Sequence, residues 1–181
     1  MSASAASSFS LRNALRRFRR HRRGSAIVEF ALVAPVFFAL LFAIIEMAMV
    51  FFAQQVLESM TEEAARMVLT GQPQNAGANA ALFKSNYVCN QISVLFSCNN
   101  VYFDVQSYPQ FSNIVINSQI DNNGCFVPPT NYNPGGPGNI VVVRLFYQWP
   151  LLVTGLGFNI SNVCGSKRLL AATAAFQNEP Y

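Results

Sequence analysis

Apolar residues dominate one continuous stretch near the start of the chain, from Ser25 to Ala53. This stretch contains no basic residue and only two acids, Glu29 and Glu46. About 20 apolar residues in a helix are enough to cross the hydrocarbon core of a bilayer. The pattern therefore predicts one transmembrane helix over residues 25–53.

The helical pattern continues beyond this span and becomes amphipathic over residues 54–70. Gly71 and Pro73 then end it. A helix from Ser25 to Leu69 would extend about 68 Å at 1.5 Å per residue, about twice the thickness of a bilayer core. Its outer part is therefore expected to form a stalk or the spine of a small domain. The predicted packing face consists of Ala53, Val56, Met60, Ala64 and Met67.

This packing face could lie on the chain's own domain or on a helix of another subunit, and the spacing leaves both open. Within the span, Pro35 removes one backbone hydrogen bond, so a local kink is expected there.

After Gly71 the pattern changes to shorter elements. Residues 72–81 form a polar linker, and a second helix is predicted over 78–95. Alternating or β-branched residues predict strands at 100–108 and 139–149, with a Pro-, Gly- and Asn-rich loop at 126–138 before the second. The C-terminal stretch that begins at Lys167 alternates well enough for a final strand. Residues 71–181 are thus expected to form an α+β domain whose small antiparallel sheet packs on the long helix.

The charge is divided unevenly along the chain. The net charge is +4, but seven of the twelve basic residues are arginines within residues 1–24. The remainder holds five basic and eight acidic residues, a balance of 5 − 8 = −3. Arginines beside an apolar span usually hold that end in the cytoplasm. The tail is therefore interpreted as a cytoplasmic leader and not as a nucleic-acid-binding arm, because the apolar segment follows it at once.

A cleaved secretory signal is the rival interpretation of this N-terminus. Such a signal has an apolar core of about 7–15 residues and then an Ala-x-Ala-like site. The span here is longer, and no Ala-x-Ala lies between Leu41 and Glu63. A retained helix with its C-terminal end outside the cytoplasm is the better fit.

The cysteines agree with an exported domain. Cys89, Cys98, Cys125 and Cys164 all follow the span, and an even number in an exported segment predicts two disulfides. Three pairings are possible, and proximity favours Cys89–Cys98, which leaves Cys125–Cys164. A zinc site is the alternative, but it lacks a Cys-x-x-Cys pair and a nearby histidine.

No catalytic constellation is recognisable. The one histidine, His21, lies in the arginine tail, and Glu62 and Glu63 are neighbours that point about 100° apart on a helix. We therefore expect no enzyme activity, no cofactor and no bound metal.

The segment Gly24-Ser25-Ala26-Ile27-Val28-Glu29-Phe30 resembles the processing site of type IV pilin-like precursors. More narrowly, the chain resembles the TadE-like pseudopilins of tight-adherence (Flp) pilus systems. Residues 138–152 are similar to the strand and Pro-Leu segment of many such proteins. Residues 168–181 are similar to their usual C-terminus, with Gln177 where arginine is common.

This resemblance implies a sequence of events. A prepilin peptidase would cut between Gly24 and Ser25, and Glu29 would become the fifth residue of the mature chain. Its carboxylate would then meet the new N-terminal amine of a neighbouring subunit. Glu46 lies 17 residues beyond Glu29, about 25 Å along a helix, which favours a place at the outer membrane interface and leaves a second intersubunit contact open. The implied partners are the peptidase, other pilins and pilus assembly proteins, and the lipid bilayer.

The implied location is the bacterial inner membrane, with the C-terminal domain in the periplasm and with incorporation in a pilus as a further step. Two other classes stay open: a membrane-anchored binding or adhesin module, and a membrane-tethered enzyme.

Overall fold

The computed structural model of the chain describes residues 25–91, 95–152 and 158–180. These residues divide into two compact units, one that extends to Ile44 and one that begins at Ile45. The architecture is α+β, as the sequence predicts. The basic leader, residues 1–24, lies outside the described residues.

The first element is a 45-residue helix, α2 (Ser25–Leu69), which contributes to both units. It contains no glycine and is rich in alanine, leucine, methionine and phenylalanine, and its helical assignment runs through Pro35 without a break. Gly71 ends it with a φ of 73°, a left-handed conformation that glycine adopts readily. The predicted extent of this helix, including its end before Gly71, is confirmed.

The predicted second helix over 78–95 is only partly correct, and its residues 92–94 lie outside the described residues. Short α3 (Gln72–Asn75) lies within the expected linker and is followed by α4 (Ala80–Phe83), which Asn79 caps through its side chain. A π-helical turn at Lys84–Val88 and a 3₁₀ turn at Cys89–Gln91 then replace a regular helix. Phe83 is fully buried here, where its ring stacks on Tyr87 and makes a tilted contact with Tyr132.

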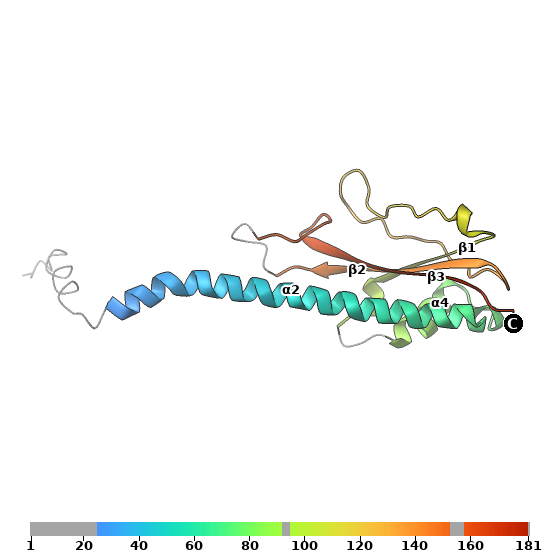
Figure 1. Ribbon diagram of the computed structural model, residues 1–181, viewed down its shortest axis with the longest axis horizontal. Coiled ribbons are helices and arrows are strands. Elements are labelled where there is room, and N and C mark those ends of the chain that lie inside the picture. The colour runs from blue at the N-terminus through green and yellow to red at the C-terminus, as the bar shows by residue number, and fades with distance from the viewer. Residues whose placement is uncertain (1–24, 92–94, 153–157, 181) are drawn as a thin grey trace, which may run out of the picture. The chain divides into compact units, whose positions relative to one another are not determined.

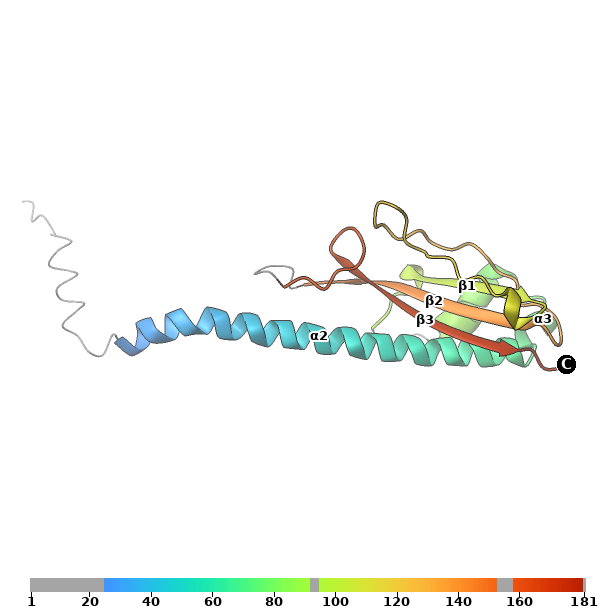
Figure 2. The same ribbon diagram turned by 45° about the horizontal axis from the view of Figure 1, so that its top comes forward.

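The second unit contains a three-stranded antiparallel sheet in the order β1-β2-β3 (Figures 1 and 2). Its strands are β1 (Val101–Tyr108), β2 (Ile140–Pro150) and β3 (Lys167–Gln177). All of the predicted strands therefore exist. In the register, Arg144 at the centre of β2 lies opposite Asp104 on β1 and Thr173 on β3.

The two faces of the sheet are covered differently. One face packs on the part of α2 that belongs to the second unit, and the buried core draws from both: Val50, Ala53, Leu57, Met60, Ala64, Val68, Val101, Val105, Val141, Val143, Leu145, Leu170 and Ala172. On the other face, the loop between β1 and β2 covers the sheet, with Phe126 against Tyr102 and Phe146. Of the two partners that the sequence left open for the packing face of α2, the structure shows the chain's own domain.

The buried stripe of α2 differs in part from the prediction. Leu57 is fully buried, whereas Val56 and Met67 are only half-buried. Val56 and Leu57 are adjacent and both apolar, so helical spacing alone could not choose between them.

Both edges of the sheet are partly occupied. Residues 131–133 lie beside β1, where Asn133 N–H donates to the Val105 carbonyl at 2.8 Å. At the start of β3 the side chain of Asn162 accepts a hydrogen bond from Leu169 N–H. Such cover limits pairing with a foreign strand.

The four cysteines form two disulfides, Cys89–Cys98 and Cys125–Cys164. The first closes the irregular helical turns before β1. The second ties the β1–β2 loop to the segment that leads into β3. These are the two predicted pairs, of which proximity along the sequence favoured Cys89–Cys98 and left Cys125–Cys164.

Candidate functional site

The predicted processing and assembly residues lie at the start of α2. Ser25 is the first residue of the helix, and Glu29 and Phe30 lie in its second turn. Both of these side chains are exposed, Phe30 to 67%. Gly24 lies outside the described residues.

The side chain of Glu29 makes no hydrogen bond or ion pair within the described parts of the chain. Helical spacing puts it on one face with Ala26 and Val33, and Val33 is 62% exposed. A carboxylate in an apolar environment is costly unless it is paired. The geometry thus presents an acid on an apolar helix surface that is available to another molecule.

The helix around Glu29 exposes apolar side chains on all sides. Between Ile27 and Ile45 the exposed large hydrophobic residues are Ile27, Val28, Phe30, Leu32, Val33, Val36, Phe37, Phe38, Leu40, Leu41, Phe42, Ile44 and Ile45. Among the described residues, α2 is the one helix long and apolar enough to cross a membrane. A surface of this kind suits lipid or the helices of neighbouring subunits.

Glu46 is buried inside the second unit, with 7% of its surface exposed. Its Oε1 accepts a hydrogen bond from the backbone N–H of Leu152, two residues beyond the end of β2. The sequence alone did not predict this contact of Glu46. Contacts between residues 106 positions apart depend on the fold and leave no local signal.

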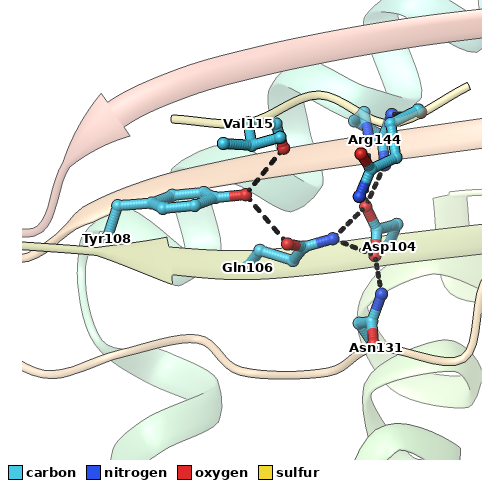
Figure 3. Close-up of polar contacts among 7 residues, drawn as sticks. Asp104, Gln106, Tyr108, Val115, Asn131 and Arg144 are labelled. Carbon is cyan, nitrogen blue, oxygen red and sulfur yellow. Dashed lines mark hydrogen bonds and ion pairs between the residues drawn. The ribbon is translucent and has the colours of Figure 1, made fainter. Parts of the chain in front are cut away.

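A second polar centre lies on the loop-covered face of the sheet and was missed by the sequence analysis. Arg144 donates to Asp104 Oδ2 through Nε at 2.9 Å and Nη2 at 2.5 Å, and both residues are at least 96% buried (Figure 3). Asn131 and Gln106 each donate to Asp104 Oδ1 at 3.0 Å. A charged residue in the middle of the apolar run "VVVRLFY" was the signal available in the sequence.

This centre holds the β1–β2 loop to the sheet. Arg144 Nη1 donates to the Asn117 carbonyl at 3.0 Å, and Tyr108 Oη donates to the Val115 carbonyl at 3.0 Å. The charges are paired and bonded to their neighbours, as buried ions must be. Their arrangement is that of a structural clamp, without an acid or base free to act on a substrate.

A pocket of about 260 Å³ beside β1 contains a single charged residue, Lys84. Burial lowers the pKa of Lys84, whose ammonium donates to the Asn99 carbonyl at 3.4 Å. No carboxylate lines this pocket. The described residues also contain no group of three or more His, Cys, Asp or Glu side chains arranged to hold a metal ion.

Tyr132 is the second described residue whose pKa is shifted. Burial, and then the neighbouring Tyr87, raise the pKa of Tyr132 to about 12. Its hydroxyl is buried and makes no hydrogen bond with the described residues. It packs among Phe83 and Phe103, which makes it part of the aromatic core and not of a reactive site.

Comparison with known proteins adds one match and two negative results. Residues 24–66 match the sequence model of the TadE-like protein family. No curated protein and no solved structure matches the chain. The matched segment begins at Gly24, contains Glu29 and Phe30, and covers α2 almost to its end. The resemblance drawn from the residues is therefore confirmed over residues 24–66, where this chain is similar to the TadE-like protein family.

Proposed function

We propose that the chain is a pseudopilin that takes part in assembling a tight-adherence pilus, after a prepilin peptidase has removed residues 1–24. The observation that carries the proposal is the exposed acid on the apolar part of α2: Glu29 lies five residues after Gly24, among exposed apolar side chains. The TadE-like match over this segment suggests a role in pilus-related assembly. Such proteins are structural, and nothing found here indicates catalysis.

The proposed topology follows from charge and cysteine chemistry. The arginines of residues 1–24 keep that end in the cytoplasm, and α2 crosses the inner membrane from residue 25 to 53. The domain at 71–181 then lies in the periplasm, where its two disulfides persist in an oxidising environment. The helix residues from Ile45 onward belong to the same compact unit as that domain, and Val50 and Ala53 contribute to its core.

In the assembly step, cleavage creates an ammonium group at Ser25, and Glu29 of one subunit pairs with the ammonium of a neighbour. The pairing offsets the cost of a carboxylate in hydrocarbon and sets the axial register between subunits. The exposed apolar side chains of the first unit supply the helix–helix contact around it.

Two variants separate the processing step from the assembly step. Gly24→Ala is expected to leave the leader attached in most molecules, whereas Glu29→Ala is expected to be processed normally and to fail in assembly. The measurements are the mass of the mature chain and the amount of pilus recovered from cells. Glu62→Ala is the matched control, because Glu62 is an exposed acid on the same helix within the second unit.

The alternative is a membrane-anchored binding or adhesin module that needs α2 only as a tether. That function would survive replacement of residues 25–45 by an unrelated apolar span. The pseudopilin proposal instead requires loss of assembly in the same replacement, even if the domain folds and reaches the membrane.

A further inference from the structure

The outer edge of β3 is covered along its first part only. In an antiparallel strand, alternate residues direct both their N–H and their C=O group toward the same side. On the outer side of β3, the carbonyls of Leu169 and Ala171 accept hydrogen bonds from side chains, the second from Gln54 at 3.0 Å. The same alternation turns the backbone groups of Thr173 and Ala175 outward, where none of the described residues bonds to them.

The composition of this edge does not protect it from another strand. Natural edge strands carry lysines, prolines or bulges that prevent such pairing. Over residues 169–177, β3 has no charged residue, proline or glycine, and its register with β2 continues without a bulge. Ala171, Thr173 and Ala175 are small and exposed. The free part of the edge, residues 173–177, can therefore accept one more strand.

The same chain contains a segment that is suited to become such a strand. Residues 114–118, "IVINS", lie in the β1–β2 loop and form neither helix nor strand. Residues 114–116 are all β-branched, as strands favour. Val115 is 61% and Ile116 60% exposed, and the backbone groups of Ile116 make no hydrogen bond with the described residues. The segment thus exposes apolar side chains together with unpaired backbone.

The direction of this segment follows from its own contacts. Tyr108, at the end of β1, donates through Oη to the Val115 carbonyl (Figure 3). Arg144, which lies level with the middle of β1, donates to the Asn117 carbonyl. The segment therefore passes along β1 in the reverse direction. Because β1 and β3 both pair antiparallel with β2, they run the same way, and residues 114–118 are antiparallel to β3.

The direction of β3 relative to the helix decides which pairing between copies is possible. Gln54 of α2 bonds to Ala171 near the middle of β3. The Leu69 carbonyl, at the end of α2, accepts from Glu179 N–H at 3.1 Å, beyond the end of β3. Within the second unit, β3 therefore runs the same way as α2. Two β3 edges paired antiparallel would point the helices of two copies in opposite directions, whereas residues 114–118 of a neighbour can pair antiparallel with β3 while both helices point the same way.

We propose that residues 114–118 of one copy pair with residues 173–177 of β3 in the next copy and add a fourth strand to its sheet. The partner is a second copy of this chain. The backbone groups of Ile116 supply hydrogen bonds, as in other cases of strand addition, and neither surface brings a charged residue into the contact. Because the two surfaces differ, the contact is heterologous and repeats from copy to copy.

The inference rests on the proposed function, since a contact this short needs the copies to be held together elsewhere. The proposed packing of the apolar helices keeps them close, which raises the effective concentration of each surface for the other. The sheet contact then fixes how the second units of neighbouring copies are placed.

Cysteine cross-linking in the membranes of producing cells provides the test. The four native cysteines are paired in two disulfides, so an added pair is free to react across the contact. The test variant is Ile116→Cys with Thr173→Cys. The matched control is Ser85→Cys with Thr173→Cys, because Ser85 is equally exposed but lies in the turns before β1.

Mild oxidation should convert most of the test variant into a ladder of dimers, trimers and longer products, while the control pair gives no ladder. Dimers formed by Thr173→Cys alone would show β3 edges paired with each other and would overturn the inference. Assembled pilus material without the ladder also overturns it and keeps the proposed function. Absence of assembled material contradicts the proposed function, and the sheet contact with it.

A blocking substitution in the test variant gives a second measurement. Ala175→Lys places a charge on the free edge, the device by which natural edge strands avoid pairing. Because Ala175 is exposed, the lysine leaves the domain folded, which thermal unfolding checks. We expect Ala175→Lys to remove most of the ladder and Asn90→Lys, in an exposed turn, to leave it unchanged. A ladder that persists in Ala175→Lys counts against the pairing.

Discussion

At the scale of single residues, the most consequential pair in the second unit is Asp104 and Arg144. Removing one partner leaves a buried charge without compensation, which costs about 3–5 kcal/mol. We expect Asp104→Leu alone and Arg144→Met alone each to destabilise the full chain by about that amount. The double variant should be less destabilised than either single one, because no orphaned charge remains. Denaturant unfolding in detergent micelles measures all three, and a double variant that loses the sum of both single effects would contradict the account.

Tyr132 gives a prediction about pH. An unfolded tyrosine has a pKa of about 10, and in the folded chain burial and Tyr87 raise the pKa of Tyr132 to about 12. The folded state therefore holds this proton more tightly than the unfolded state. Its contribution to stability is fully present below pH 10 and is lost as pH rises from about 10 to about 12.

Tyr132→Phe removes the titrating group, so the variant should lose less stability than the parent across that pH range. It should also be no less stable at pH 7, since the buried hydroxyl makes no hydrogen bond with the described residues. Thermal unfolding at pH 7 and at pH 11 provides the comparison, with Tyr102→Phe as a control for the loss of one phenol. Equal alkaline losses in parent and Tyr132→Phe would refute the pH prediction.

At the scale of elements, sequence patterns predicted what is local and missed what depends on the fold. The extent of α2 was predictable because Gly71 and Pro73 end an uninterrupted helical pattern. The strands were predictable from alternation and β-branched residues. The irregular turns at 84–91 were not, because the constraint there is the packing of Phe83 against Tyr87 and Tyr132.

The same distinction between local patterns and contacts made by the fold applies to the candidate site. Glu29 could be found because an acid in an apolar run is conspicuous in any sequence. The bond from Leu152 to Glu46 and the pair Asp104–Arg144 join residues 106 and 40 positions apart. Such contacts depend on strand register and on the packing of helix against sheet, and neither is encoded within a short window.

The corrected packing face of α2 can be tested directly. Leu57 is fully buried against the sheet, so Leu57→Ala should destabilise the chain by about 2–5 kcal/mol. Val56 is adjacent and only half-buried, and Val56→Ala should cost clearly less. Denaturant unfolding of both variants in detergent micelles distinguishes the two faces. A larger loss of stability in Val56→Ala than in Leu57→Ala would instead support the packing face predicted from spacing alone.

At the scale of the whole molecule, the chain combines an apolar helix that carries one exposed acid with a domain held together by a buried core and two disulfides. The domain does not use Glu29, and the described structure gives Glu29 no partner. An unpartnered acid on an apolar helix is expensive in a bilayer unless a second molecule supplies the counter-charge. In our account this counter-charge is the amine that cleavage creates.

The most direct test of that claim is the mass of the intact protein extracted from membranes of cells with and without a working prepilin peptidase. We predict a chain that begins at Ser25 in the first case and a chain that keeps residues 1–24 in the second. If cells with an active peptidase yield only the chain with its arginine leader, no new amine exists for Glu29 to meet and the account is contradicted.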